Sequence, residues 1–142
     1  MTSDGPDLTA RLHETMPLCA TLDFTASRFD ADGVVLHVEW APGLCTSAGI
    51  LHGGTLMALA DAAGGACAFF HLPDGATGTS TIESKTNFFR GVGDGTVTAT
   101  STPLHVGSTT IVIETLVTNM SSRGDRLVAK VTQTQAVLRP RS

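Results

Sequence analysis

The residues best suited to chemistry lie in one apolar stretch, residues 51–70, which reads LHGGTLMALADAAGGACAFF. Asp61 is the only charged residue between Gly53 and Phe70. Burying a carboxylate among apolar side chains is costly unless the group is paired or protonated, so its presence indicates a specific purpose. A carboxylate in such a place can activate water as a general base or attack a carbonyl directly. A purely structural carboxylate bonded to neighbouring strands is the alternative.

His52, Gly53 and Gly54 open the same stretch, where the pattern predicts the start of a helix. The first amides of a helix have no intrahelical acceptor and lie at the positive end of its dipole. They can therefore stabilise an oxyanion, and glycine lets a substrate approach the backbone closely. The structural alternative is that the two glycines only permit close packing of the helix.

Gly53 and Asp61 are eight residues apart, which is about 12 Å along a helix at 1.5 Å per residue. One helix cannot bring both groups to the same carbonyl carbon. Two antiparallel copies can, with Gly53 of one chain facing Asp61 of the other. If both residues are catalytic, the protein is at least a homodimer with two shared sites.

Length and charge exclude several classes of protein. The 142 residues fit a single domain that can bury a sizeable core, with no repeat or linker. A net charge of −4 with nine Lys and Arg residues gives no basic stripe for nucleic acid. The three cysteines are an odd number without the spacing of a metal site, which favours reduced thiols and a cytoplasmic protein.

The chain does not have the pattern of a secreted or membrane protein. Its first sixteen residues lack the basic end and apolar run of a secretory signal. Residues 51–70 are about long enough to span a bilayer, but Asp61, the Gly64-Gly65 pair and the absence of flanking Lys or Arg clusters argue against it. We expect a core helix of a protein that binds no membrane.

The remaining elements predict an α+β fold. A short helix within residues 1–16, capped between Ser3 and Asp7, ends at Pro17. A β-hairpin follows from about Thr21, turning at Asp32-Gly33, and the long helix comes next. Four threonine-rich runs then predict strands, which we expect to form an antiparallel meander curved around the helix: about 78–90, 96–102, 109–119 and 127–138.

Three segments together resemble a known family. These are residues 43–54 (GLCTSAGILHGG), the Leu59-Ala60-Asp61 triplet and residues 86–90 (TNFFR). They are similar to hotdog-fold acyl-CoA thioesterases, most of all to the phenylacetate-pathway type of the 4-hydroxybenzoyl-CoA thioesterase superfamily. The resemblance covers about residues 16–138. It implies a curved antiparallel sheet of about six strands around one long central helix, paired into dimers and commonly into homotetramers.

The resemblance also implies roles for individual residues. Acyl-CoA would be hydrolysed to free acid and CoA without a metal or organic cofactor, at sites on the dimer interface. The backbone amide of Gly53 would be the oxyanion donor and Asp61 the base or nucleophile, assisted by the hydroxyl of Thr81, or of Thr79 if the alignment slips by two. Since the family uses the acid, we expect His52 to cap the helix or position the loop rather than act as a base.

Thr46 departs from the family pattern. Many relatives carry Asn six residues before the His, and an amide can donate and accept where a shorter hydroxyl has one donor. This difference motivates an alternative function, a non-catalytic acyl-CoA binding module on the same fold. Hydratases and dehydratases on this fold use a His and an acid at another spacing, which fits this chain less well.

Substrate contacts are the least specified part of the site. Gly54, Phe88 and Met57 are candidates for substrate binding, although the apolar ones are equally suited to a core. The CoA phosphates require basic residues, of which Arg90 at a strand end is the first candidate; the others are Lys85, Arg123, Arg126 and Lys130. Cys67 lies deep in the helix, where nothing lowers the pKa of a thiol, so we expect it to pack in the core.

Overall fold

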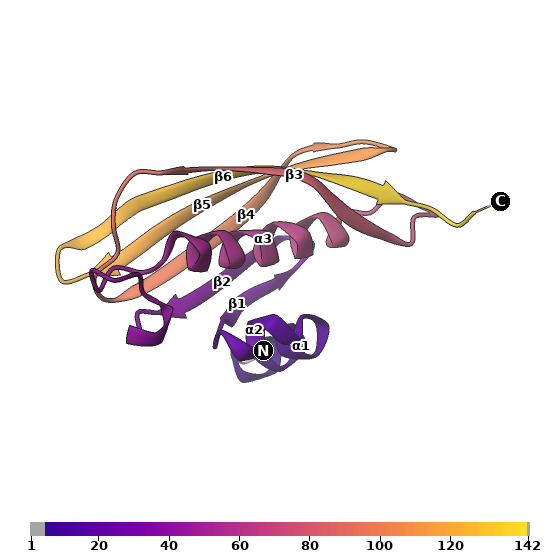
Figure 1. The fold of residues 1–142 in the computed structure, drawn as a ribbon. Coiled ribbons are helices and arrows are strands. Elements are labelled where there is room, and N and C mark those ends of the chain that lie inside the picture. The colour runs from indigo at the N-terminus through magenta and orange to yellow at the C-terminus, as the bar shows by residue number, and fades with distance from the viewer. Residues whose placement is uncertain (1–4, 142) are drawn as a thin grey trace.

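The computed structural model describes residues 5–141 and has an α+β architecture in which one long helix lies against a curved sheet (Figure 1). The expected cap at Ser3 lies outside the described residues. The elements in chain order are α1 (Gly5–Thr15), α2 (Pro17–Thr21), β1 (Thr25–Asp30), β2 (Gly33–Glu39), a 3-10 turn (Pro42–Leu44), α3 (Gly53–Phe70), β3 (Gly78–Phe88), β4 (Thr96–Val106), β5 (Thr110–Ser121) and β6 (Gly124–Leu138).

All six strands form one antiparallel sheet in the order β1-β2-β4-β5-β6-β3. The predicted four-strand meander is therefore wrong in one respect, because β3 pairs with β6 and not with β4. Both edges of β4 are taken, by β2 and β5. Residues 89–95 cross the roughly 14 Å of three strand spacings between β3 and β4, which seven extended residues can span. The glycines of this segment are typical of a hairpin turn, and for this reason the sequence predicted that β3 and β4 are neighbours.

The long central helix was predicted correctly, but it is not covered on all sides. Ten of the eighteen residues of α3 are buried against the concave face of the sheet. A stripe at three- and four-residue spacing is not buried: Gly54, Met57, Asp61 and Phe69 are exposed, and Gly65 between the last two is half-buried. By length and mean hydropathy, 1.3, α3 is able to cross a membrane, yet its burial in the fold explains its apolar composition. The exposed stripe is surface that this protomer leaves uncovered.

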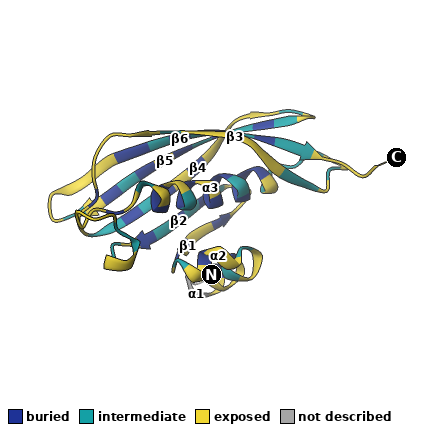
Figure 2. Ribbon diagram, in the orientation of Figure 1, coloured by how far each residue is buried: buried dark blue, intermediate teal, exposed yellow. Residues whose placement is uncertain are grey.

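β3 is an edge strand with one neighbour in the sheet. None of its eleven residues is buried, and Figure 2 shows it without the dark blue of the buried class. Ile82 and Phe88 are 60% and 49% exposed. A long edge strand with apolar side chains and free backbone groups is a template for another chain. It lies beside the exposed stripe of α3, since residues of both elements line one pocket.

The N-terminal segment differs from the prediction in its second half. Thr21 belongs to the short helix α2, which Pro17 begins, and the strand β1 starts at Thr25. Proline is pre-organised for the first turn of a helix, so Pro17 ends one helix and starts another. β4 is longer than predicted and includes Pro103, because β2 pairs only as far as Ser101 and leaves Pro103 on an edge.

Candidate active site

The start of α3 presents one free backbone amide. His52 is the N-cap, and its Nδ1 accepts a hydrogen bond of 2.8 Å from the amide of Gly54. In a neutral imidazole the other nitrogen then carries the proton, so the ring has no free lone pair to act as a base. The amide of Gly53 has no acceptor among residues 5–141. Gly53, and not Gly54, is therefore the amide available to an oxyanion.

The loop before α3 is bonded to the helix start through Leu44 and Thr55. The Leu44 carbonyl accepts hydrogen bonds from the His52 amide at 2.9 Å and from the buried Thr55 hydroxyl at 3.0 Å. Thr46 turns this loop, with its amide bonded to the Ile50 carbonyl at 2.8 Å, and its side chain is exposed. Thr46 thus lies near the Gly53 end of the helix. Sequence reasoning missed Thr55, which reads as an ordinary helix residue.

Asp61 meets Thr81 from the neighbouring strand β3. The Thr81 hydroxyl donates a hydrogen bond to the Asp61 carboxylate. Asp61 is only partly shielded from solvent by its pocket, and this partial burial raises its pKa above the usual value, while the bond from Thr81 partly offsets the rise. The sequence left Thr81 and Thr79 as alternatives. Both line the pocket around Asp61, and it is Thr81 that bonds to the carboxylate.

Two buried glutamines of β6 orient Thr81. Gln135 Nε2 donates to the Thr81 hydroxyl at 2.6 Å and to Gln133 Oε1 at 2.5 Å. Gln133 Nε2 in turn donates to the Ala60 carbonyl of α3 at 3.4 Å. Since Thr81 accepts from Gln135, its only proton is directed at Asp61. Both glutamines are at most 1% exposed, which makes this network rigid.

Sequence reasoning missed Gln133 and Gln135, although a signal was present. Two glutamines at i and i+2 on a strand that is otherwise apolar on that face place two amides in the core. Gly64 makes room for them: a Cβ at that position would collide with the Gln133 amide. No such collision exists at Gly65, where a Cβ meets nothing within 4 Å.

Asp61 opens into a pocket of about 500 Å³. Small residues of α3, Ala62, Gly65 and Ala66, form part of its wall, and Phe69 and Phe70 follow at the end of the helix. Phe70 packs edge-on against Phe29 of β1 at 5.1 Å between ring centroids. The pocket is therefore polar near Asp61 and apolar beyond it.

A second cavity, of about 610 Å³, gathers three of the five basic candidates: Arg90, Arg123 and Arg126. The hydroxyls of Ser121 and Ser122 lie in it as well. None of the three guanidinium groups has a carboxylate within 4.0 Å in the described part of the chain. Lys130 is instead paired with Glu114 at 3.3 Å, and Lys85 lies exposed on β3.

Arg90 connects this cavity to the helix start. A third, shallower pocket holds Gly53, Phe88 and Arg90, and the Phe88 ring lies 3.2 Å from where a Cβ of Gly53 would be. Met57, one turn further along α3, lies on the exposed stripe and is 45% exposed. The basic cavity and the free amide are thus at one end of α3, and the Asp61 pocket is nearer the other.

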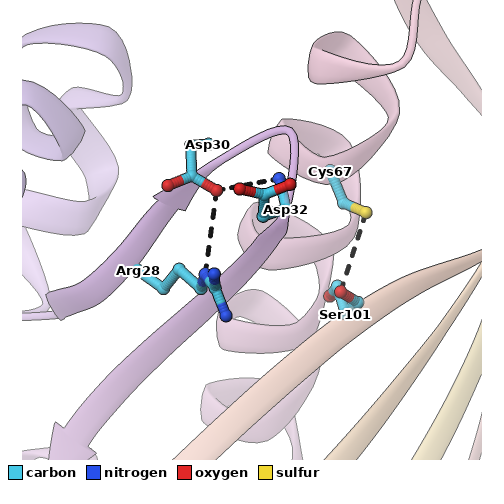
Figure 3. Close-up of polar contacts among 5 residues, drawn as sticks. All are labelled: Arg28, Asp30, Asp32, Cys67 and Ser101. Atoms are coloured by element: carbon cyan, nitrogen blue, oxygen red, sulfur yellow. Dashed lines mark hydrogen bonds and ion pairs between the residues drawn. The ribbon is translucent and has the colours of Figure 1, made fainter.

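Two of the three cysteines, Cys19 and Cys67, are buried. Burial raises the pKa of Cys67 to about 11, and its Sγ donates to the Ser101 carbonyl at 3.7 Å (Figure 3). Cys19 is likewise buried, with its pKa raised to about 11. Such thiols are inert, as expected for Cys67. The described residues contain no group of three or more His, Cys, Asp or Glu side chains placed to hold a metal.

A family model and a curated relative each match more than half of this chain. A family model described as Thioesterase superfamily matches residues 48–132. "Putative esterase Rv1847" from Mycobacterium tuberculosis is 30% identical over 105 residues, which cover 72% of this chain and 75% of the relative.

Two solved structures are similar over most of the chain. A mutant of the phenylacetic acid degradation protein PaaI from Thermus thermophilus is 25% identical, with a TM-score of 0.74, covering 86% of this chain and 99% of the other. Thioesterase HI1161 from Haemophilus influenzae shares the fold, with a TM-score of 0.81 at 23% identity and coverage of 98% and 93%. These similarities support a hydrolase that acts on thioesters in general. The chain belongs to the Thioesterase superfamily.

Proposed function

We propose that this protein hydrolyses acyl-CoA thioesters at two identical sites shared across a homodimer. The observation that carries the proposal is the pairing of two complementary groups on α3: the free amide of Gly53 at its start and the Thr81-oriented carboxylate of Asp61 in its middle. The first suits the oxyanion of a tetrahedral intermediate, and the second suits a base or nucleophile.

A dimer is required because the two groups lie about 12 Å apart along one helix. The uncovered stripe of α3 and the free edge of β3 adjoin each other, so one two-fold contact would cover both. In that arrangement Gly53 would bind the carbonyl oxygen. Asp61 of the partner subunit would take a proton from the attacking water, which displaces the CoA thiolate. Alternatively it would attack the carbonyl carbon and displace the CoA thiolate, forming an anhydride that water then opens.

The basic cavity supports coenzyme A as the thiol part of the substrate. Its guanidinium groups have no carboxylate partner in residues 5–141 and suit bidentate binding of phosphates. Arg90 belongs to both this cavity and the pocket beside Gly53, so a thioester carbonyl at Gly53 is compatible with a nucleotide among the arginines. The acyl group would then extend into the pocket beside Asp61.

A homotetramer is the assembly that we propose beyond the dimer. Leu116, Met120 and Leu127 are 40%, 57% and 42% exposed, and the pairing of Thr118 with Leu127 gathers them on the outer face of the sheet. Such a patch favours a second contact between copies. The molecular mass in solution tests the assembly.

The function is tested with purified protein and a panel of acyl-CoA esters. We expect release of free thiol, and its loss in Asp61→Asn. Full activity in Asp61→Asn would contradict the proposal. Tight, stoichiometric binding of acyl-CoA with no thiol release would instead favour the binding module that Thr46 suggested.

A further inference from the structure

The pocket beside Asp61 contains a cation from a distant part of the chain. Arg11, in the N-terminal helix α1, lines it together with residues of α3, β1 and β3. Asp61 and Arg11 are the only residues of the lining whose side chains are charged near neutral pH. A guanidinium group in an acyl pocket needs an explanation, because an acyl chain without polar groups gains nothing from it.

Arg11 does not neutralise Asp61. The two side chains form no ion pair within 4.0 Å, and the pKa of Asp61 responds to burial and to Thr81. Arg11 is held instead by an aromatic ring, since its guanidinium carbon lies 5.5 Å from the centroid of the Phe29 ring. A cation over an aromatic face is attracted to it, which fixes the side chain without using its hydrogen-bond donors.

Arg11 lies at the end of the pocket remote from Asp61, and therefore remote from the thioester carbonyl carbon on which Asp61 is proposed to act. Phe29 packs against Phe70, which follows Asp61 by nine residues, or about 13 Å along α3. Between them lie the small residues of the wall, Ala62, Gly65 and Ala66. The pocket thus has a carboxylate at one end, an apolar middle and a guanidinium group at the other end.

We propose that this pocket selects acyl groups that carry a carboxylate at the end remote from the thioester, and that Arg11 binds this carboxylate. The inference rests on the acyl-CoA thioesterase function proposed above. A guanidinium group offers paired donors that match a carboxylate, and its own charge compensates the charge of the substrate. The apolar middle accommodates the methylene chain. Arg11 is thus a specificity-determining residue and takes no part in bond breaking.

The test compares pairs of CoA esters that differ only at the remote end: glutaryl-CoA with pentanoyl-CoA, and adipoyl-CoA with hexanoyl-CoA. We expect the wild-type kcat/KM to favour the carboxylate-bearing member of at least one pair by about tenfold, as for one charge-assisted hydrogen bond. Arg11→Gln should remove this preference mainly by raising KM for that member. It should leave the alkyl member unchanged within about twofold.

Arg28→Gln is the matched control. Arg28 is also an exposed arginine, but it pairs with Asp30 at 3.7 Å on the β1-β2 hairpin (Figure 3). It does not line the pocket. This variant should keep the wild-type preference.

Equal kcat/KM for both members of each pair, or an equal loss for both in Arg11→Gln, would overturn the inference. Failure of the thioesterase function has a different signature, because no ester would release thiol. In that case calorimetric titration of adipoyl-CoA and hexanoyl-CoA into the wild type and Arg11→Gln decides the question. Tighter binding of adipoyl-CoA that the variant loses would support Arg11, and identical affinities would contradict it.

Discussion

The amide of Gln135 lies 2.6 Å from the hydroxyl of Thr81 and donates to it, although the two residues are separated by 54 positions in the chain. Because Thr81 accepts this bond, its one proton remains available to the Asp61 carboxylate. The carboxylate proposed to act on the substrate is therefore oriented from the core of the sheet.

Gln135→Leu should lower kcat about tenfold while changing KM little, because the Thr81 hydroxyl loses the partner that orients it. It should also lower the free energy of unfolding by about 1–3 kcal/mol, since Gln133 is left with an unpaired buried oxygen. Steady-state kinetics and denaturant unfolding measure both. Thr134→Val is the control: Thr134 lies on the same strand and bonds at the surface to Glu83. Unchanged kcat in Gln135→Leu would refute the orienting role.

The dependence of activity on pH should reflect the raised pKa of Asp61. A base must be deprotonated, so kcat should fall toward acid with an inflection above the ordinary value of 3.8 for an aspartate. Thr81→Val removes the hydrogen bond that lowers this pKa, and the inflection should move to higher pH. Thr79→Val, in the same pocket, should leave it in place. A shift in the opposite direction in Thr81→Val would contradict the assigned bond.

Asp61→Asn should separate a catalytic carboxylate from a structural one. Because the pKa of Asp61 is raised by folding, its contribution to stability is lost as pH rises from the unfolded value through the folded one. At pH values above both pKa values Asp61 is charged, and the folded state disfavours this charged carboxylate. Asp61→Asn replaces it with a neutral amide of the same shape, so the variant should be at least as stable as the wild type. Chemical denaturation at pH 4 and pH 8 measures the difference. A marked loss of stability at pH 8 would mean that Asp61 holds the fold together.

Two adjacent glycines of α3 offer a test of the buried amide network. Gly64→Ala should destabilise the protein by about 1–3 kcal/mol, because the new methyl group displaces Gln133. Gly65→Ala should cost nothing within the protomer and gain up to about 1 kcal/mol of helix propensity. Thermal unfolding of the two variants compares them directly. Equal melting temperatures would show that Gln133 does not pack as described.

The sequence predicted those parts of the site that lie close together in the chain. His52, Gly53 and Asp61 belong to one helix, whose period and composition are local properties. Thr81 was reached through a family pattern, and of the two threonines it is the one whose side chain is bonded to Asp61. The cap formed by His52 was also expected, and the bond to the Gly54 amide confirms it.

The parts that the sequence did not predict depend on pairing between distant strands. Gln135 reaches Thr81 only because β3 pairs with β6, with Thr81 opposite Gln135 in the register. The predicted meander paired β3 with β4, so it did not place Thr81 beside Gln135. Arg11 reaches the pocket because α1 packs beside β1, which no local pattern indicates. Strand order and helix docking are non-local, and a single sequence carries little information about them.

The free amide of Gly53 can be removed without removing the helix. Gly53 is the first residue of α3, a position that proline favours, and His52 already has the extended ψ of 136° that a following proline requires. Gly53→Pro should lower kcat about 100-fold or more, as expected for loss of an oxyanion donor. Gly53→Ala is the matched control. Like proline, alanine adds a Cβ near the exposed Phe88 ring, but it keeps the backbone amide, so this variant should retain most of the activity.

The central claim is that each site takes Gly53 from one subunit and Asp61 from the other. Co-expression of Gly53→Pro with Asp61→Asn tests it, because a mixed dimer would contain one site with both groups intact. Random assortment would make half the dimers mixed, each with one intact site of two, so the mixture should recover about 25% of wild-type thiol release. Separately expressed variants should stay inactive. A co-expressed mixture with verified mixed dimers and no recovered activity would contradict the shared site.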